Sequence, residues 1–128
     1  MYTGQEIPPL PNSLQVADFA DGFVQLCAQS ALGFGADRRT PVSTRPVVRI
    51  KYDGPRVVVL PCTTRPPRVS SEFFELTPER VMWTQQENRA SFAFYRYEAV
   101  PIDAVHGKIG TMPHAARIDL LAWLKGRY

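Results

Sequence analysis

The sequence has few cysteines and no long apolar run. No apolar stretch approaches the roughly 20 residues of a membrane-spanning helix, so we expect no transmembrane segment. No basic region precedes an apolar one near Met1, so we expect no signal peptide. The sequence therefore predicts a cytoplasmic protein. The two cysteines, Cys27 and Cys62, are isolated and too few for a disulfide framework, and we interpret both as free thiols.

Several common kinds of catalytic site are also missing from the sequence. His106 and His114 have no cysteine or carboxylate cluster beside them, so we expect no metal site. The glycines match no phosphate-binding loop, and no Ser/His/Asp arrangement indicates a serine hydrolase. We therefore expect the protein to work without a metal or any other cofactor.

Charge is distributed unevenly along the 128 residues. Residues 1–37 contain no lysine or arginine, and their four charged groups are all acidic. Residues 38–68 contain eight basic groups, with Asp53 as the one acidic group. A one-sided basic block is typical of a protein that binds a polyanion. The length and the ordinary composition, 45% hydrophobic and 21% charged, predict a single globular domain over 1–128.

The pattern of apolar residues, glycines and prolines divides the chain into four regions. Residues 1–12 are rich in proline and predict an extended lead-in. Residues 13–33 place apolar side chains at helical spacing and predict an N-terminal helix. Residues 44–104 predict antiparallel strands, and the following "HGKIG" predicts a turn. Residues 111–126, with Thr111 as a cap, predict a C-terminal helix. Its expected apolar face comprises Ile118, Leu121, Ala122 and Leu124.

The stretch "TRPVVRIKYDGPRVVVLPCTTRP", residues 44–66, predicts a β-hairpin with Thr-Arg-Pro at both outer ends. Pro55 has no N–H to close a two-residue turn, so we expect a three-residue loop from Asp53 to Pro55. Pairing outward from that loop places Arg45 opposite Thr63, whereas a one-residue slip would place it opposite Cys62. In either register the two ends of the stretch meet in space.

Alternation along this hairpin separates two faces. The expected core face comprises Val48, Ile50, Val58 and Leu60. The opposite face comprises Arg45, Arg49, Lys51, Val57, Val59 and Thr63. The order of helix, four or five antiparallel strands and helix predicts a mainly β protein of the α+β kind. A small, strongly curved sheet or partly open barrel with helices on its margins suits that order.

Three segments carry a resemblance to a known family. They are "RPVVRI", "VVVLPCT" and "YEAVPIDAVHGKIGTMPHAARIDLLAWL", which cover about half the chain, roughly residues 45–64 and 91–124. In their order and spacing they resemble the MazF/PemK family of bacterial toxin ribonucleases, whose fold is a small antiparallel barrel related to SH3 domains. Members of that family usually begin with a short strand and a Gly-rich loop before the Arg-Pro. Here the predicted helix and the acidic segment stand in that place.

The resemblance implies a set of catalytic positions. Arg45 and Thr63 lie where the family has its catalytic arginine and threonine, with Thr64 as the alternative if the register slips. Arg96-Tyr97-Glu98 is similar to an Arg-x-Asp that some members carry near the last strand. The resemblance further implies a metal-independent endoribonuclease acting on single-stranded RNA, a homodimer, and a small acidic antitoxin as protein partner.

The residue types suit one chemistry in particular. RNA is cleaved when its 2′-hydroxyl attacks the adjacent phosphate, and the enzyme must then stabilise extra negative charge on phosphorus. The guanidinium of Arg45 can bind two phosphate oxygens, and Thr63 can donate one hydrogen bond. Neither group is a base, so Glu98 or a water would accept the proton. The residues expected to bind RNA are Arg49, Lys51, Thr64, Arg65, Arg68 and Arg96.

Other interpretations of the same residues remain open. Arg45 can be a surface arginine at a strand entrance, and Thr63 a hydroxyl that caps a backbone group in a turn. The whole chain can be a non-catalytic barrel that binds a protein or peptide, with the acidic residues 1–37 folded over its basic groove. A DNA-binding accessory protein is a third possibility, for which the sequence offers no recognition helix.

Overall fold

The computed structural model describes residues 22–36, 42–65, 67–84 and 92–127, and these residues form strands, short 3₁₀ turns and one helix. The strands are β1 (Phe23–Ala28), β2 (Thr44–Asp53), β3 (Arg56–Thr63), β4 (Phe73–Glu75), β5 (Met82–Trp83), β6 (Phe92–Phe94), β7 (Glu98–Pro101) and β8 (Val105–Thr111). The 3₁₀ turns are η2 (Gln29–Ala31), η3 (Ser70–Glu72) and η5 (Ile102–Ala104), and the helix is α1 (His114–Arg127).

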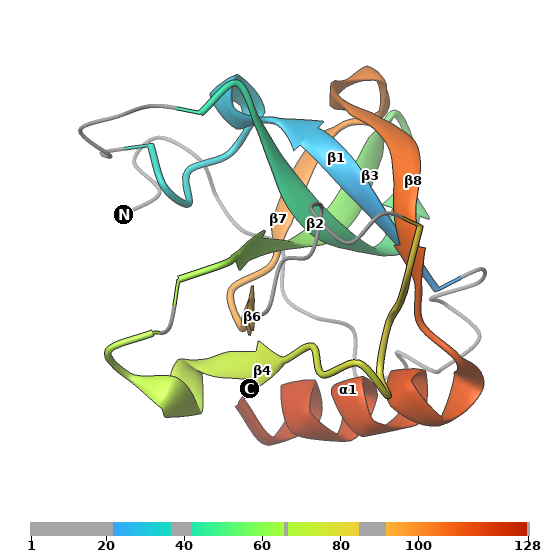
Figure 1. The fold of residues 1–128 in the computed structure, drawn as a ribbon. Helices are drawn as coiled ribbons and strands as arrows, with labels where there is room; N and C mark the ends of the chain where they lie inside the picture. Colours follow the sequence, from blue (N-terminus) through green and yellow to red (C-terminus); the bar gives the residue numbers. More distant parts are fainter. Residues whose placement is uncertain (1–21, 37–41, 66, 85–91, 128) are drawn as a thin grey trace.

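The strands form one antiparallel sheet, in the order β4-β6-β3-β2-β1-β8-β5, with β7 paired to β3. The sheet curls, and α1 lies across its open side (Figure 1). The expected mainly β fold with a C-terminal helix is confirmed, and of the two expected forms, a curved sheet or a partly open barrel, the structure has an open, curved sheet. In the described part of the chain the end strands β4 and β5 are not paired with each other. Both strands are short. Residues 76–81, which connect them, form a loop that packs near α1 and makes no strand pairing.

Strand β3 organises the sheet because both of its edges are paired. β2 covers one edge from Val47 onward, while the other edge is shared by β7 and β6. β7 pairs with Arg56–Val59 and β6 with the last two residues, Cys62 and Thr63. Residues 92–101 therefore run along β3 as one interrupted strand, broken at 95–97. The break places Tyr97 in the main core.

The hairpin of β2 and β3 differs from the expected one at its turn. Asp53 pairs with Arg56, so the turn has two residues, Gly54 and Pro55. The expected pairing of Val48 with Leu60 is nevertheless confirmed, because a bulge between Arg49 and Lys51 removes the one-residue offset. Proline is tolerated because Pro55 is the second of the two turn residues, in place of the last residue of the expected three-residue loop. Its missing N–H then belongs to no ladder pair.

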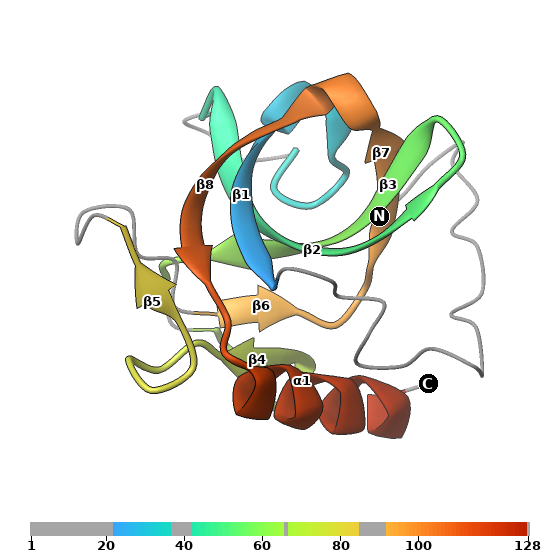
Figure 2. The same ribbon diagram turned by 90° about the vertical axis from the view of Figure 1, so that its right-hand side faces the viewer.

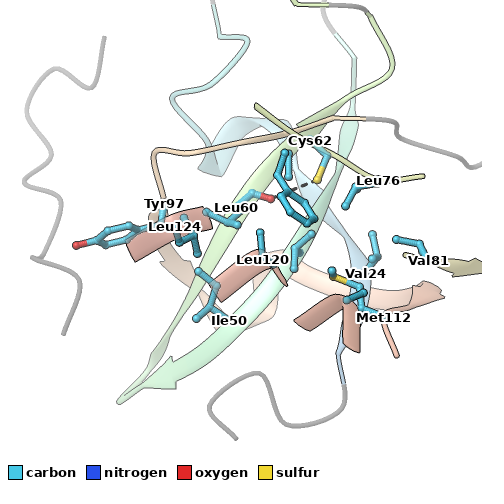
Figure 3. Close-up of a cluster of buried hydrophobic side chains, with 14 of the residues drawn as sticks. Val24, Ile50, Leu60, Cys62, Leu76, Val81, Tyr97, Met112, Leu120 and Leu124 are labelled. Carbon is cyan, nitrogen blue, oxygen red and sulfur yellow. Dashed lines mark hydrogen bonds between the residues drawn. The ribbon is translucent and has the colours of Figure 1, made fainter. Parts of the chain in front are cut away.

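The main core lies between the sheet and α1 (Figure 3). It contains the four residues of the expected core face, namely Val48, Ile50, Val58 and Leu60. The helix contributes Ala116, Leu120, Leu121 and Leu124. Of the expected helix face, Leu121 and Leu124 are confirmed, whereas Ile118 and Ala122 are exposed. The helix begins at His114, not near Thr111, which ends β8.

The opposite face of the sheet carries a second core inside the curl. It comprises Cys27, Leu32, Val47, Val57, Val59 and Val100. Figure 2 shows the segment after β1 tucked within the curl, where Leu32 joins this cluster. Valines of both faces of the hairpin are therefore buried, so this sheet is not apolar on one side and polar on the other.

Two expected elements are wrong in the described residues. The N-terminal helix predicted over 13–33 is replaced from Phe23 onward by β1, which pairs with both β2 and β8, and residues 13–21 lie outside the described part. The "HGKIG" expected as a turn lies within β8. Apolar residues at 23, 24 and 27 fit both periods, and the two neighbouring strands favoured the extended form.

A truncation in α1 tests the main core. Leu124 is fully buried, so Leu124→Ala should lower the free energy of unfolding by about 2–5 kcal/mol through lost contacts and a cavity. Ile118, 46% exposed on the same helix, is the matched control, and Ile118→Ala should cost less than about 1 kcal/mol. Urea denaturation of both variants measures the difference, and equal losses would contradict this packing of the helix.

The two cysteines are buried free thiols, as expected from the sequence. Burial raises the pKa of Cys62 to about 12, an effect that a backbone hydrogen bond from Val48 and the charge of Arg45 partly offset. Burial and, secondarily, the carboxylate of Glu98 raise the pKa of Cys27 to about 11. Both thiols therefore stay protonated in the folded protein at neutral pH.

The raised thiol pKa values predict a loss of stability in alkali. Above pH 9 the unfolded chain releases thiol protons that the folded chain retains, so the free energy of unfolding falls as pH rises. Each thiol contributes about 1.4 kcal/mol per pH unit. In urea denaturation, Cys62→Ala should show a clearly smaller decline than wild type. Equal declines would mean that Cys62 is not protected from ionisation.

Candidate active site

The three residues predicted to be catalytic lie on one face of the sheet. Arg45 is on β2, Thr63 ends β3, and Glu98 begins β7. Side chains alternate between the two faces of a sheet along each strand. Each of these three residues lies an even number of positions from a second-core residue on the same strand. All three therefore lie on the face inside the curl. The structure thus confirms the shared face expected for Arg45 and Thr63 and adds Glu98 to it, while the catalytic roles of all three stay predictions.

Arg45 is buried, with 4% of its surface exposed, and its guanidinium is held from several sides. Its Nε donates to Oε1 of Gln29 at 2.8 Å, and its Nη1 donates to the carbonyl of Cys62 at 3.0 Å. The guanidinium also lies over the ring of Phe34, 4.9 Å from the centroid. The bond to Cys62 confirms that the two ends of the hairpin meet. The alternative of Arg45 as a surface arginine is wrong.

Glu98 is also buried, with 7% of its surface exposed, and its two oxygens accept from two consecutive backbone amides. Oε1 accepts from the N–H of Gly33 at 2.8 Å, and Oε2 accepts from the N–H of Phe34 at 3.0 Å. The carboxylate lies close enough to Cys27 to contribute to the raised pKa of that thiol. Glu98 therefore anchors the segment that follows β1.

That segment, Gln29–Ala36, is called the cover loop here because it contacts both charged residues. Its backbone turns twice, with Leu32 N–H donating to Gln29 O and Ala36 N–H donating to Gly33 O. Gly35 has φ of +77°, and a side chain there would overlap the Arg45 guanidinium. A residue without Cβ is therefore needed both for the backbone conformation and for the close approach.

The ring of Phe34 lies against two aromatic side chains, Phe73 and Phe94, which we call the aromatic nest. The Phe34 ring centroid is 5.1 Å from that of Phe94 and 6.4 Å from that of Phe73. The two nest rings are themselves 5.1 Å apart. All three rings are partly exposed. The nest continues the inner face of the sheet from Thr63, because Thr63 pairs with Phe92 and Phe94 lies two residues further along β6.

Thr63 lies at the edge of this site, where β3 runs into a basic loop. It is half-buried, and its Oγ1 accepts from the N–H of Arg65 at 3.2 Å. The alternative interpretation of Thr63, a hydroxyl that caps a backbone group, therefore agrees with this contact, and its catalytic role stays a prediction. Thr64, Arg65 and Arg68 follow it in the sequence and are exposed, so they can meet a ligand arriving from solvent.

The remaining predicted RNA contacts are spread more widely. Arg49 is nearly buried, where its guanidinium lies over the rings of Phe23 and Tyr52 and donates to the Tyr52 hydroxyl. It lies four residues from Arg45 along β2, which is about 13 Å of strand. Lys51 is half-buried, still nearer the hairpin tip. Arg96 is exposed, and its Nε donates to the hydroxyl of Tyr95 at 3.3 Å.

Sequence reasoning missed the contacts of the cover loop with Arg45 and Glu98, and it missed the aromatic nest. The available signal was "GFG" at 33–35, an aromatic residue between two glycines shortly before the Arg-Pro. Assigning residues 13–33 to a helix concealed it. With β1 in place of the predicted helix, a short strand and a glycine-containing loop precede Arg45 in the described residues.

A hollow lies at the turn between β4 and β5, beside α1, and it does not suit a polyanion. It is lined by Glu75, Thr77, Glu79, Arg80, Ala115, Ala116 and Asp119. Its three carboxylates would repel phosphate groups. Within residues 22–36, 42–65, 67–84 and 92–127, no group of three or more histidine, cysteine or acidic side chains is placed to hold a metal. The described helices also include none that is long and apolar enough to cross a membrane.

Comparison with known proteins finds a similar fold among solved structures. No protein-family model matches the sequence, and no curated protein matches it. Among solved structures, the chain is similar to an endoribonuclease in complex with its cognate antitoxin from mycobacterial species, with a TM-score of 0.53 and 14% sequence identity. The similarity covers 83% of this chain and 90% of that one. At this identity the likeness establishes a shared fold: the described sheet and helix follow the fold of an endoribonuclease.

Proposed function

We propose that this protein is a metal-independent endoribonuclease of the MazF/PemK kind that cleaves single-stranded RNA. The observation that carries the proposal is the Arg45 guanidinium, held beside the end of β3 by its bond to the Cys62 carbonyl, 3.0 Å long. Thr63 follows immediately, and exposed arginines continue from it. The fixed guanidinium of Arg45, the hydroxyl of Thr63 and the start of a positively charged loop thus meet at one end of the hairpin. An endoribonuclease shares this fold.

In the proposed reaction the 2′-oxygen of a ribose attacks the adjacent phosphorus and the bond from phosphorus to the 5′-oxygen breaks. The products are a 2′,3′-cyclic phosphate and a free 5′-hydroxyl. Arg45 stabilises the negative charge that develops on the phosphate oxygens, and its permanent charge suits that role. Thr63 donates a hydrogen bond to the same oxygens. The proton of the attacking hydroxyl passes to a water or to Glu98, and the leaving oxygen gains one.

The described conformation is closed to RNA, so the proposal requires the cover loop to move. Arg45 is nearly buried, with Gln29 and Phe34 of that loop against its guanidinium. Lifting the loop would expose the guanidinium to a phosphate and would replace one set of hydrogen bonds by another. Loops that close over a site in this way commonly limit the rate of turnover.

The proposal extends to partners and location. Residues 38–68, with eight basic groups against one acidic group, would attract RNA and equally a small acidic antitoxin. The solved endoribonuclease of the same fold was bound to its antitoxin, which supports a protein partner of that kind. We propose a cytoplasmic homodimer, and single-stranded RNA as substrate.

A non-catalytic binding module is the second candidate, and one observation favours it. Both Arg45 and Glu98 are engaged by the chain's own cover loop, as they would be if their role were to hold the fold. A lid formed by the acidic N-terminal segment was part of this alternative, and most of that segment, residues 1–21, lies outside the described residues.

Cleavage of a long single-stranded RNA in EDTA tests the proposal. Wild-type protein should cut at specific sites and leave 2′,3′-cyclic phosphate ends, and Arg45→Ala should lower the rate by about a hundredfold or more. Arg45→Lys, which keeps the charge but loses the two-pronged guanidinium, should fall between them. Arg56→Ala is the matched control, because this exposed arginine at the hairpin tip pairs with Asp53 alone among the contacts described.

Circular dichroism must first show that the Arg45 variants fold, since that residue is buried. A well-folded wild-type protein that binds RNA without cutting it would favour the binding module. Cuts that persist unchanged in Arg45→Ala would remove Arg45 from the reaction.

A further inference from the structure

We propose that Glu98 and the aromatic nest form a subsite for an unpaired guanine, which the cover loop occupies in this structure. The inference rests on the proposed function, since it names the base that the RNA presents beside the cleaved phosphate. It assigns Glu98 to recognition of the base instead of to proton transfer. Its basis is the pattern of donors that the cover loop presents to Glu98 and the position of the Phe34 ring.

The hydrogen bonds of Glu98 have the pattern of a guanine edge. Two neighbouring N–H groups, from Gly33 and Phe34, point at the two oxygens of one carboxylate at 2.8 and 3.0 Å. On its Watson–Crick edge guanine presents two adjacent N–H donors, N1–H and the N2 amino group. Adenine and cytosine present a donor next to an acceptor, and uracil presents one donor between two acceptors. Only guanine can therefore replace both amides without turning an acceptor toward the carboxylate.

The Phe34 ring shows where the base would stack. It lies against the rings of Phe94 and Phe73, with the Arg45 guanidinium over its face. Flat aromatic side chains and arginine planes are the groups on which proteins stack unpaired RNA bases. With the cover loop displaced, a purine can take the place of the phenyl ring between the same partners.

Burial makes the replacement selective. Glu98 is 7% exposed, and a buried carboxylate that loses both of its donors is costly. Opening the cover loop therefore favours a ligand that supplies two donors over one that supplies a single donor. A site built around such paired polar groups rejects analogues that lack one of them far more strongly than an apolar pocket does.

The subsite lies next to the proposed phosphate site. Phe94 is on β6, two residues from Phe92, which pairs with Thr63. The Arg45 guanidinium reaches both the end of β3 and the Phe34 ring. A guanine in the aromatic nest would thus belong to a nucleotide that flanks the phosphate held by Arg45 and Thr63.

The test measures binding without cleavage. Short RNA oligonucleotides with 2′-fluoro sugars lack the attacking hydroxyl, and a single guanine, inosine, adenine or cytosine is placed in a run of uridines. Fluorescence anisotropy with the full chain should show at least tenfold tighter binding of the guanine oligonucleotide than of the adenine, cytosine or all-uridine ones. Inosine lacks only the N2 amino group, so it should bind about tenfold more weakly than guanine.

Two variants and a control place the preference on these residues. Glu98→Gln has one acceptor oxygen instead of two and should lose most of the guanine preference. Phe34→Ala removes the competing ring and should bind the guanine oligonucleotide several-fold more tightly with the preference retained. Glu75→Gln, a carboxylate exposed on β4, is the matched control and should behave as wild type.

The outcomes separate the two hypotheses. Tight binding of all oligonucleotides alike, or equal binding of guanine and inosine by the unmodified protein, would overturn the guanine subsite and leave the ribonuclease proposal standing. Failure of wild type and Phe34→Ala to bind any of them would count against the ribonuclease proposal and remove the subsite with it. Because the inosine comparison uses the native chain, it decides the matter even if Glu98→Gln does not fold.

Discussion

The burial of two charged side chains beneath one loop is the constraint on which the inner face of this protein depends. Arg45 and Glu98 are both removed from water beneath the same loop, with 4% and 7% of their surfaces exposed. Charges in such positions are tolerated only when hydrogen bonds replace their hydration. The cover loop supplies them through Gln29 and the amides of Gly33 and Phe34.

The same loop completes the second core. Leu32 packs among the valines inside the curl, and Gly35 lets the backbone pass directly over the guanidinium. Loop, second core and charged pair therefore support one another. Opening the loop for a ligand must break hydrogen bonds to both charges, unless the ligand supplies replacements. An RNA phosphate suits the guanidinium and a base edge suits the carboxylate, so the groups that hold the closed form are also those that a nucleotide can satisfy.

The hairpin shows which features local sequence rules can predict and which they cannot. The pairing of Val48 with Leu60 and the faces of the hairpin follow from alternation, because one face had to be buried against a core. The turn was wrong by one residue, and the bulge between Arg49 and Lys51 compensates for it. A bulge is hard to predict from a sequence, because the residues on both sides of it have the pattern of a regular strand.

The sequence by itself determined the mainly β character, the core face of the hairpin, the C-terminal helix and the meeting of Arg45 with the end of β3, because these follow from local periodicity and a short turn. Only the tertiary structure decided that residues 23–28 form a strand, since apolar spacing there fits both periods and the choice lay with β2 and β8. It also decided that Arg45 and Glu98 are buried. For Glu98 that outcome depends on a loop that lies 65 residues away in the chain, a contact that no local pattern encodes.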